Sequence, residues 1–316
     1  MKILIASRSF GKATPEVFDR LRAAGCEIMP NPHERAPSED EMVALISDAE
    51  VLISGTEPVT ARVLAAAKRL RGISKHGVGY ENIDLNAAKA RGVIVCIAGG
   101  TITNSVADMA FALLLALARK IPQGDRMVKR EQWGRTVGVE LAGKTLGIIG
   151  LGQIGKAVCR RAKGFEMNVL AYDTFHDAEF AAQWGVHYLG LEEVLRQSDF
   201  VSLHAPGGNN TRALINADSL AQMKTGAYLI NTARGELVDE LALAETLRTG
   251  KLAGAASDVF VNEPPAATHP LLALDNFIAA PHSAGQTIEG LRAMGDVTCD
   301  NALRMLRNEQ PKFRVI

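Results

Sequence analysis

The chain has 316 residues, of which 47% are hydrophobic and 22% are charged, and its 35 basic and 35 acidic residues give a formal net charge of zero. A length beyond the usual limit for one hydrophobic core predicts two domains. The balanced charge argues against nucleic acid or a membrane as a partner. No apolar run reaches the roughly 18 residues of a membrane span, and the apolar run at residues 1–6 is too short for a signal peptide. These features are typical of a soluble globular protein.

The cysteines bear on where the protein works. The four are widely separated and form no C-x-x-C pair: Cys26, Cys96, Cys159 and Cys299. Their spacing predicts neither a metal site nor a disulfide framework, and small buried side chains explain all four. We therefore expect a cytoplasmic protein that holds no metal ion.

Strand-like and helix-like runs alternate along the first third of the chain. Such alternation predicts a parallel sheet covered by helices. The predicted strands are residues 2–6, 27–29, 51–53, 72–74 and 93–96, and the helical patterns between them are 15–24, 38–47, 61–67 and 85–90.

The most informative segment is residues 144–173, which follows an alanine- and leucine-rich helical pattern at 104–118. The segment reads as an apolar strand, a glycine turn, a helix, a second strand and a terminal acid. A dinucleotide-binding unit has this order of elements. Because the whole order is present, chance is a poor explanation for the glycine pattern.

Three glycines and one acid in this segment have separate tasks. Gly150, Gly152 and Gly155 form the sequence G-x-G-x-x-G. Gly150 permits a tight turn, Gly152 lets the backbone approach a pyrophosphate, and Gly155 lets the helix pack closely on the strand. Asp173 ends the second strand, where a carboxylate accepts hydrogen bonds from a ribose diol. That carboxylate would repel the 2′-phosphate of NADP, and no arginine follows it within residues 174–176, so we expect NAD as the cofactor.

From residue 145 onward the alternation resumes with six predicted strands. They are residues 145–149, 168–172, 200–203, 227–231, 254–259 and 276–279, and a last helical pattern covers 287–307. Six strands that begin with the glycine turn fit one doubly wound dinucleotide domain. The whole chain is therefore predicted to be an α/β protein with two doubly wound parallel sheets.

Polar and ionisable residues follow the later strands, and ligands bind beyond the carboxyl ends of strands in an open parallel sheet. Arg234, Glu263 and His282 together suit hydride chemistry on a 2-oxo acid. An arginine binds a carboxylate and polarises the neighbouring carbonyl, and a histidine exchanges a proton with the hydroxyl. A carboxylate beside the imidazole fixes its tautomer and favours its charged form. Taken singly, Arg234 also fits a helix cap, Glu263 a solvated loop acid and His282 a satisfied polar residue.

These segments resemble the D-isomer-specific 2-hydroxyacid dehydrogenases essentially from end to end. The matching segments are residues 77–84, 150–155, 204–206, 231–235, 258–264 and 281–285. The resemblance implies a Rossmann NAD domain at residues 99–285 and a discontinuous, flavodoxin-like substrate domain at 1–98 plus 286–316, with a cleft between them. It also implies the NAD-dependent interconversion of a 2-oxo acid and a D-2-hydroxy acid.

The resemblance assigns roles to individual residues. Arg234 would hold the substrate carboxylate and carbonyl, His282 would be the acid/base, and Glu263 would be its partner. Asp258 would hold the nicotinamide carboxamide, and Asp173 the adenosine ribose. The expected cofactor residues are Gly150, Gly152, Gln153, Ile154, Gly155, Asp173, His204, Ala205, Pro206, Thr211, Thr232, Ala233, Arg234, Asp258, His282, Ala284 and Gly285. The expected substrate residues are Lys75, His76, Gly77, Val78, Gly79, Arg234 and His282, with backbone amides of the glycine-containing segment on the substrate carboxylate.

Departures from the family pattern narrow the substrate. Formate dehydrogenases carry glutamine where Glu263 stands, so formate is not expected. The nearest likeness is to 3-phosphoglycerate dehydrogenases without a regulatory domain, yet the segment where those enzymes place a phosphate-binding arginine contains Glu57. A carboxylate repels a phosphate. The distal end of the substrate is instead expected at Arg8, Lys75 or His76, as for hydroxypyruvate or a sulfonated or phosphorylated analogue, although a solvated surface position explains Arg8 equally well.

Two further expectations come from the resemblance. A homodimer is implied, because in the family the helix at 104–118 and the segment through Trp133 build the dimer contact; alternatively, Trp133 and residues 113–115 belong to the core. Some relatives are corepressors that bind NAD(H) without turnover, and the retained Arg234, Glu263 and His282 do not exclude that function. The chain has no obvious insertion for docking a peptide, which favours the enzyme.

Overall fold

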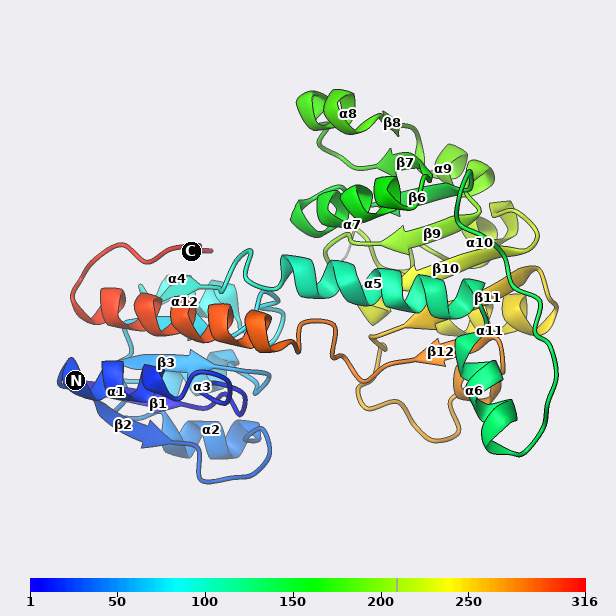
Figure 1. Ribbon diagram of the computed structural model, residues 1–316. Helices are drawn as coiled ribbons and strands as arrows, with labels where there is room; N and C mark the ends of the chain where they lie inside the picture. The colour runs from blue at the N-terminus through cyan, green and yellow to red at the C-terminus, as the bar shows by residue number, and fades with distance from the viewer. Residues whose placement is uncertain (209) are drawn as a thin grey trace. The chain divides into compact units, whose positions relative to one another are not determined.

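The computed structural model describes residues 1–208 and 210–316, which form two compact units (Figure 1). Unit 1 combines Met1–Ile102 with Gln286–Ile316, and unit 2 is Thr103–Gly285. No helix within the described ranges is both long and apolar enough to cross a membrane. Each unit contains one fully parallel sheet, so the predicted α/β class with two doubly wound sheets is confirmed.

The sheet of unit 1 has the order β2-β1-β3-β4-β5, the flavodoxin-like order. Its strands are β1 (Lys2–Ile5), β2 (Glu27–Pro30), β3 (Val51–Ser54), β4 (Gly72–Lys75) and β5 (Ile94–Cys96). Its helices are α1 (Glu16–Ala23), α2 (Glu39–Leu45), α3 (Ala61–Ala66), α4 (Leu85–Ala90) and α12 (Ile288–Leu306). The five strands that the sequence predicts here are confirmed, with ends shifted by one residue.

Alternate residues of the unit 1 strands face two separate cores, as the two-residue period of a strand requires. Leu4 and Leu52 pack with the helices α2, α3 and α4, whereas Ile3 and Ile53 pack with α1 and α12. The last helix α12 therefore covers the same face of the sheet as α1, although the whole of unit 2 separates them in sequence (Figure 1).

The sheet of unit 2 has the order β12-β11-β10-β9-β6-β7-β8. Its strands are β6 (Thr145–Ile149), β7 (Asn168–Tyr172), β8 (Val186–Tyr188), β9 (Phe200–Leu203), β10 (Ala227–Asn231), β11 (Leu252–Ser257) and β12 (Phe277–Ala279). Counted from β6, the order is that of a dinucleotide-binding sheet with one added strand, and it reverses between β6 and β9. Every pair is parallel, so all carboxyl ends lie at one edge.

Helices cover both faces of this sheet. The helices are α5 (Thr103–Ala118), α6 (Ile121–Lys129), α7 (Gln153–Gly164), α8 (Ala178–Trp184), α9 (Leu191–Gln197), α10 (Ala217–Gln222) and α11 (Glu240–Arg248), with short 3₁₀ turns η1 (Gly235–Leu237) and η2 (Pro270–Ala273). α5 and α7 belong to one core, and α9, α10 and α11 belong to the other.

Three sequence expectations for unit 2 are wrong. The sheet has seven strands rather than six, because β8 is a three-residue edge strand with one buried side chain and no apolar run. The strand predicted at 254–259 is Leu252–Ser257, because Val259 is buried in a turn and not in the sheet. Helix α6 is absent from the prediction, because none of its side chains is buried.

The sequence leaves two interpretations for Trp133 and residues 113–115, a dimer contact or a place in the core, and the structure gives different outcomes for the two. Leu113 and Leu114 are buried in the core of unit 2, as the core interpretation holds. Trp133 is 93% exposed, so the core interpretation is wrong for this residue.

Candidate active site

The turn between β6 and α7 uses its three glycines for different reasons. Gly150 has a φ of +94°, and a Cβ there would lie 2.6 Å from the Ala205 nitrogen. A Cβ on Gly155 would collide with the Gly150 carbonyl oxygen, so the helix can approach the strand only without a side chain. Gly152 instead faces open space, with no atom within 4 Å of a hypothetical Cβ. The turn is therefore closed on the sheet side and open at the start of α7, where a pyrophosphate needs room.

Asp173 lies beside this turn at the end of β7. One of its carboxylate oxygens accepts a hydrogen bond from the Leu151 amide at 2.6 Å, and the other accepts one from the Phe175 amide at 3.0 Å. These two amides fix the carboxylate next to the glycine turn. The Thr174 hydroxyl also donates to Oδ1 at 3.5 Å, and Oδ2 keeps a lone pair for a further donor such as a ribose hydroxyl.

Two buried polar atoms near this edge have no partner among the described residues. They are Thr232 Oγ1 and His204 Nδ1. The other His204 nitrogen bonds Ser202 Oγ at 2.8 Å, and burial lowers the pKa of this histidine to about 3. Unpaired buried polar atoms are costly. Their position at the carboxyl ends of β9 and β10 fits a bound dinucleotide that supplies the missing partners.

The remaining expected cofactor residues lie at the same edge of the sheet. Gln153 and Ile154 begin α7, Ala205 and Pro206 follow β9, Thr211 bonds the Pro206 carbonyl, Ala233 lies in the turn after β10, and Ala284 and Gly285 end unit 2. Residue 209, within the same loop as Thr211, lies outside the described residues.

The turn after β10 presents Arg234. Asn231 Oδ1 accepts from the Ala233 amide at 3.0 Å, and Asn231 Nδ2 donates to the Arg234 carbonyl at 2.8 Å. A Cβ on Gly235 would collide with the peptide that joins Phe260 to Val261. No separate role is expected from the sequence for Asn231 or Gly235. An asparagine that closes a turn on its own backbone is a local signal that could have been found.

Asp258 organises the chain that carries His282. The Asp258 carboxylate is buried and accepts from the amides of Ser283 at 2.8 Å and Ala284 at 2.7 Å. The His282 amide donates to the Asp258 carbonyl at 2.7 Å. These bonds hold His282 in the left-handed region at a φ of +51°, which a non-glycine residue adopts only when its surroundings enforce it.

Glu263 and His282 form a direct pair. His282 Nδ1 lies 2.6 Å from Glu263 Oε2, and the other Glu263 oxygen accepts from the Phe260 amide at 3.0 Å. Because the carboxylate engages Nδ1, the other imidazole nitrogen is left for a substrate. About half of the His282 side chain is exposed, so a small molecule can reach it.

The charges at the site act on one another. The hydrogen bond that His282 donates to Glu263, together with the negative charge of that carboxylate, raises the pKa of His282, while burial and the positive charge of Arg234 oppose that rise. Burial opposes ionisation of Glu263, but hydrogen bonds from His282 and the Phe260 amide outweigh it and keep the Glu263 pKa below its usual value. The three side chains therefore share one site in unit 2, with an imidazole that readily holds a proton.

The expected substrate residues of unit 1 divide into buried and open groups. Lys75 and His76 are buried: the Lys75 ammonium binds the Gly55 carbonyl and Asn82 Oδ1, and burial lowers the pKa of His76 to about 4. The His76 amide donates to the Ser54 carbonyl. The amides of residues 77–79 make no hydrogen bond within the part of the chain that the structure describes, and these residues are partly exposed.

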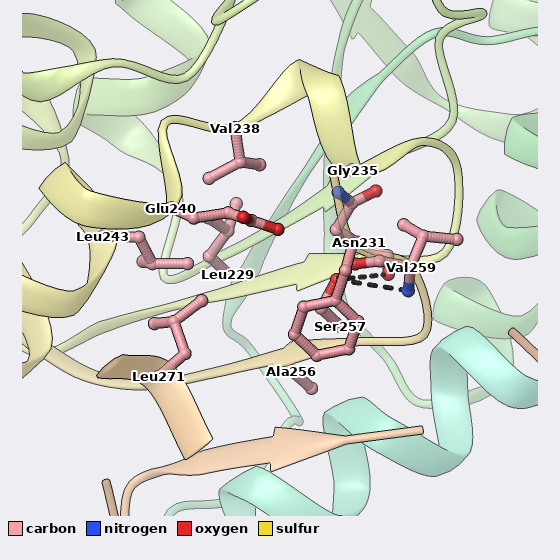
Figure 2. Close-up of a pocket in the computed structure, with 11 residues that line it drawn as sticks. Leu229, Asn231, Gly235, Val238, Glu240, Leu243, Ala256, Ser257, Val259 and Leu271 are labelled. Atoms are coloured by element: carbon pink, nitrogen blue, oxygen red, sulfur yellow. Dashed lines mark hydrogen bonds between the residues drawn. The ribbon is translucent and has the colours of Figure 1, made fainter. Parts of the chain in front are cut away.

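One cavity near this edge is too small to be the ligand site. It has a volume of about 10 Å³, and its lining residues include Gly235, Glu240 and Val259 (Figure 2). A cavity of this size is near the lower limit for one water molecule. It is a gap in the packing behind the site.

Comparisons with known proteins identify the family of the chain. Residues 111–284 match the family described as D-isomer specific 2-hydroxyacid dehydrogenase, NAD binding domain. The chain is 41% identical over 285 residues to the glyoxylate reductase of Korarchaeum cryptofilum, covering 88% of this chain and 86% of that protein. It is 41% identical over 310 residues to the D-3-phosphoglycerate dehydrogenase of Archaeoglobus fulgidus, covering 97% of this chain but only 58% of that protein.

Among solved structures, the TT0316 protein from Thermus thermophilus is similar over the full length of both chains, with a TM-score of 0.92 and 37% identity. The chain therefore belongs to the D-isomer specific 2-hydroxyacid dehydrogenase family. It is an NAD-dependent oxidoreductase that interconverts a 2-oxo acid and a D-2-hydroxy acid, as the sequence predicts. The comparisons give no support to the corepressor alternative.

Proposed function

We propose that the chain reduces a small, unphosphorylated 2-oxo acid of the glyoxylate or hydroxypyruvate type, with Arg234, Glu263 and His282 as its catalytic residues. The observation that carries the catalytic assignment is the 2.6 Å contact between His282 Nδ1 and Glu263 Oε2 at the edge where the glycine turn and Asp173 lie. When bound, the cofactor would accept a hydride as NAD⁺ in oxidation and donate one as NADH in reduction. The roles below belong to the residues of this chain.

His282 is the acid/base in this proposal. Its raised pKa favours the protonated ring, whose proton passes to the carbonyl oxygen of the substrate as the oxygen becomes a hydroxyl. In the reverse direction the neutral ring takes the hydroxyl proton. Glu263 stabilises the charged ring and fixes which nitrogen faces the substrate.

Within unit 2, Arg234 accounts for binding of the substrate carboxylate. A guanidinium binds a carboxylate through two parallel hydrogen bonds and polarises the neighbouring carbonyl. The turn closed by Asn231 fixes the backbone of Arg234, which lowers the cost of ordering its side chain.

The preference for an unphosphorylated acid rests on Glu57. This side chain is buried, and one carboxylate oxygen accepts from the Gly55 amide at 2.7 Å. A fixed negative charge in this turn opposes a phosphate group. Of the similar proteins, one is named as a glyoxylate reductase and one as a D-3-phosphoglycerate dehydrogenase, both at 41% identity, so overall identity does not favour either substrate and the proposal rests on Glu57.

A substrate panel tests the proposal. NADH oxidation is measured with glyoxylate, hydroxypyruvate, pyruvate and 3-phosphohydroxypyruvate, for the natural chain and for His282→Ala. We expect the highest kcat/KM with glyoxylate or hydroxypyruvate, and a loss in His282→Ala on the order of a hundredfold or more with NADH binding retained. A preference for the phosphorylated acid would refute the substrate class, and near-normal turnover of His282→Ala would refute the catalytic assignment. The same panel with Arg8→Ala decides whether this exposed cation contributes to specificity.

The proposal includes a homodimer. Helix α6 and the segment after it expose large apolar side chains at Ile121, Val128, Trp133 and Val137. Exposed apolar groups of this size are typical of interfaces. A second copy of the chain would cover them, as the family resemblance implies.

A cytoplasmic location is also part of the proposal. All four cysteines are free and buried, and burial raises the pKa of Cys96 to about 12 and of Cys159 and Cys299 to about 11. Such unreactive thiols suit a reducing compartment.

A further inference from the structure

Glu240 and His269 form a second carboxylate–imidazole pair in unit 2, away from the proposed catalytic residues. Glu240 begins helix α11, and His269 caps the short turn η2. His269 Nε2 lies 3.1 Å from Glu240 Oε2, and both side chains are about 15% exposed. A nearly buried polar pair of this kind needs every partner satisfied.

The hydrogen bonds of His269 identify its tautomer. The Leu271 amide donates to His269 Nδ1 at 3.4 Å, so Nδ1 is an acceptor and carries no proton. The proton is then on Nε2, which donates to the Glu240 carboxylate. The ring also packs edge-on against Phe260, with centroids 5.6 Å apart, which fixes its orientation.

The second oxygen of Glu240 bonds the turn that carries Glu263. Glu240 Oε1 accepts from the Val261 amide at 2.9 Å. The preceding amide, that of Phe260, donates to Glu263, which in turn pairs with His282. Two consecutive amides of the turn are thus bound: that of Val261 by Glu240 and that of Phe260 by Glu263.

Packing holds only the start of this turn, where Phe260 is buried in the core of unit 2. Val261 and Glu263 are exposed, and the small cavity behind the turn leaves a gap beside Val259 and Phe260. Figure 2 shows the Glu240 carboxylate pointing in among the lining residues. The peptide from Phe260 to Val261 also lies directly against Gly235, next to Arg234. A shift of the turn would therefore displace Glu263 relative to His282 and disturb the turn of Arg234.

We propose that Glu240 and His269 are positioning residues for the reaction, which hold the turn of residues 260–263 so that Glu263 stays in hydrogen-bonding distance of His282. The inference rests on the proposed catalytic roles of Glu263 and His282. Neither Glu240 nor His269 touches the substrate. They act through the backbone of the turn.

The test compares Glu240→Gln, Glu240→Ala, His269→Ala and His269→Gln with a control on the same helix. Glu245→Gln is the control, because Glu245 is exposed and its carboxylate pairs with Arg248, away from the turn of residues 260–263. For each variant, kcat, the KM for NADH, the pH dependence of kcat/KM and the Tm are measured. Glu240→Gln keeps the size of the side chain, so it serves even where Glu240→Ala does not fold.

We expect Glu240→Gln and His269→Ala to lose on the order of tenfold in kcat, below the roughly hundredfold that a 1 Å misplacement can cost. The pH inflection assigned to His282 should move to lower pH, because Glu263 pairs with it less well, while the KM for NADH stays unchanged. His269→Gln should recover most of the activity, because its amide also donates to Glu240. Glu245→Gln should match the natural chain.

A purely structural role gives a different result. Variants with a lowered Tm but an unchanged kcat and pH inflection would overturn the inference. His282→Ala is assayed alongside: if it is inactive while the Glu240 and His269 variants behave as the natural chain does, only this inference fails. If His282→Ala is active, the proposed function itself fails.

Discussion

His282 Nδ1 and Glu263 Oε2 lie 2.6 Å apart, although 19 residues separate them in sequence. The turn after β12 presents the histidine in a left-handed conformation that Asp258 enforces, and the turn after β11 presents the glutamate. Each partner alters the ionisation of the other. The pair is therefore one unit that titrates together, and its pH behaviour gives the most direct check on the site.

Glu263→Gln should shift the pH dependence of the reaction. Glu263 raises the pKa of His282, so its loss lowers that pKa. Reduction needs the protonated ring, and kcat/KM for reduction should begin to fall at a lower pH in the variant. Oxidation needs the neutral ring, so oxidation should gain activity at a lower pH. Steady-state rates in both directions across pH measure this, together with a loss of roughly tenfold in the reduction rate near neutral pH. Inflections that stay in place in both directions would contradict the role of Glu263.

Asp173→Asn should weaken discrimination between the two nicotinamide cofactors. The carboxylate accepts from the Leu151 and Phe175 amides and faces the space beside the open Gly152. Loss of its charge weakens the hydrogen bonds to a ribose diol and removes the repulsion of a 2′-phosphate. We expect the KM for NADH to rise by about tenfold, corresponding to roughly 1.4 kcal/mol, and the KM for NADPH to fall. Glu179→Gln, an exposed acid on α8, is the matched control. An unchanged ratio of the two KM values would remove Asp173 from cofactor selection.

The sequence predicts most of the fold because the local signals are strong. The buried strands of both units are apolar runs bounded by turns, and the glycine turn has a pattern that few other structures require. The signals fail at residues whose burial does not match the secondary structure that they adopt. Val259 is apolar and buried but lies in a turn, β8 is short and mostly exposed, and α6 has no buried face.

Contacts between residues far apart in sequence limit how much of the site the sequence can predict. Arg234, Glu263 and His282 could be grouped because each follows a strand of one parallel sheet, which is a topological rule. The pair of Glu240 and His269 follows no such rule: its partners lie 29 residues apart, on a helix and a 3₁₀ turn, and only packing brings them together. The support that Asp258 gives to His282 is likewise visible only in three dimensions.

Gly235→Ala should disturb both stability and turnover. A methyl group there collides with the peptide between Phe260 and Val261, so either the turn of Arg234 or the turn of Glu263 must move. Overpacking of this kind costs about 1–3 kcal/mol. Urea denaturation should show that loss, and kcat should fall because both turns carry proposed catalytic residues.

Gly124→Ala is the matched control for this substitution. Gly124 lies within α6, and no atom lies within 4 Å of a hypothetical Cβ there. The added methyl group should leave turnover unchanged and stabilise the fold by about 0.5–1 kcal/mol. Equal behaviour of the two alanine variants would show that Gly235 does not couple the two turns.

Trp133→Ser should break the proposed homodimer. The indole is 93% exposed, and tryptophan contributes heavily to interfaces when a partner buries it. Size-exclusion chromatography with light scattering should give the mass of two chains for the natural protein and a concentration-dependent shift toward one chain for the variant. Phe175→Ser is the control. Phe175 is another exposed aromatic residue, at 75%, but it lies beside Asp173, away from the α6 segment.

The natural protein is expected at twice its chain mass of 33.8 kDa. A natural protein that elutes as a single chain at all concentrations would refute the dimer, and a dimer that survives Trp133→Ser but not Phe175→Ser would place the contact elsewhere in unit 2.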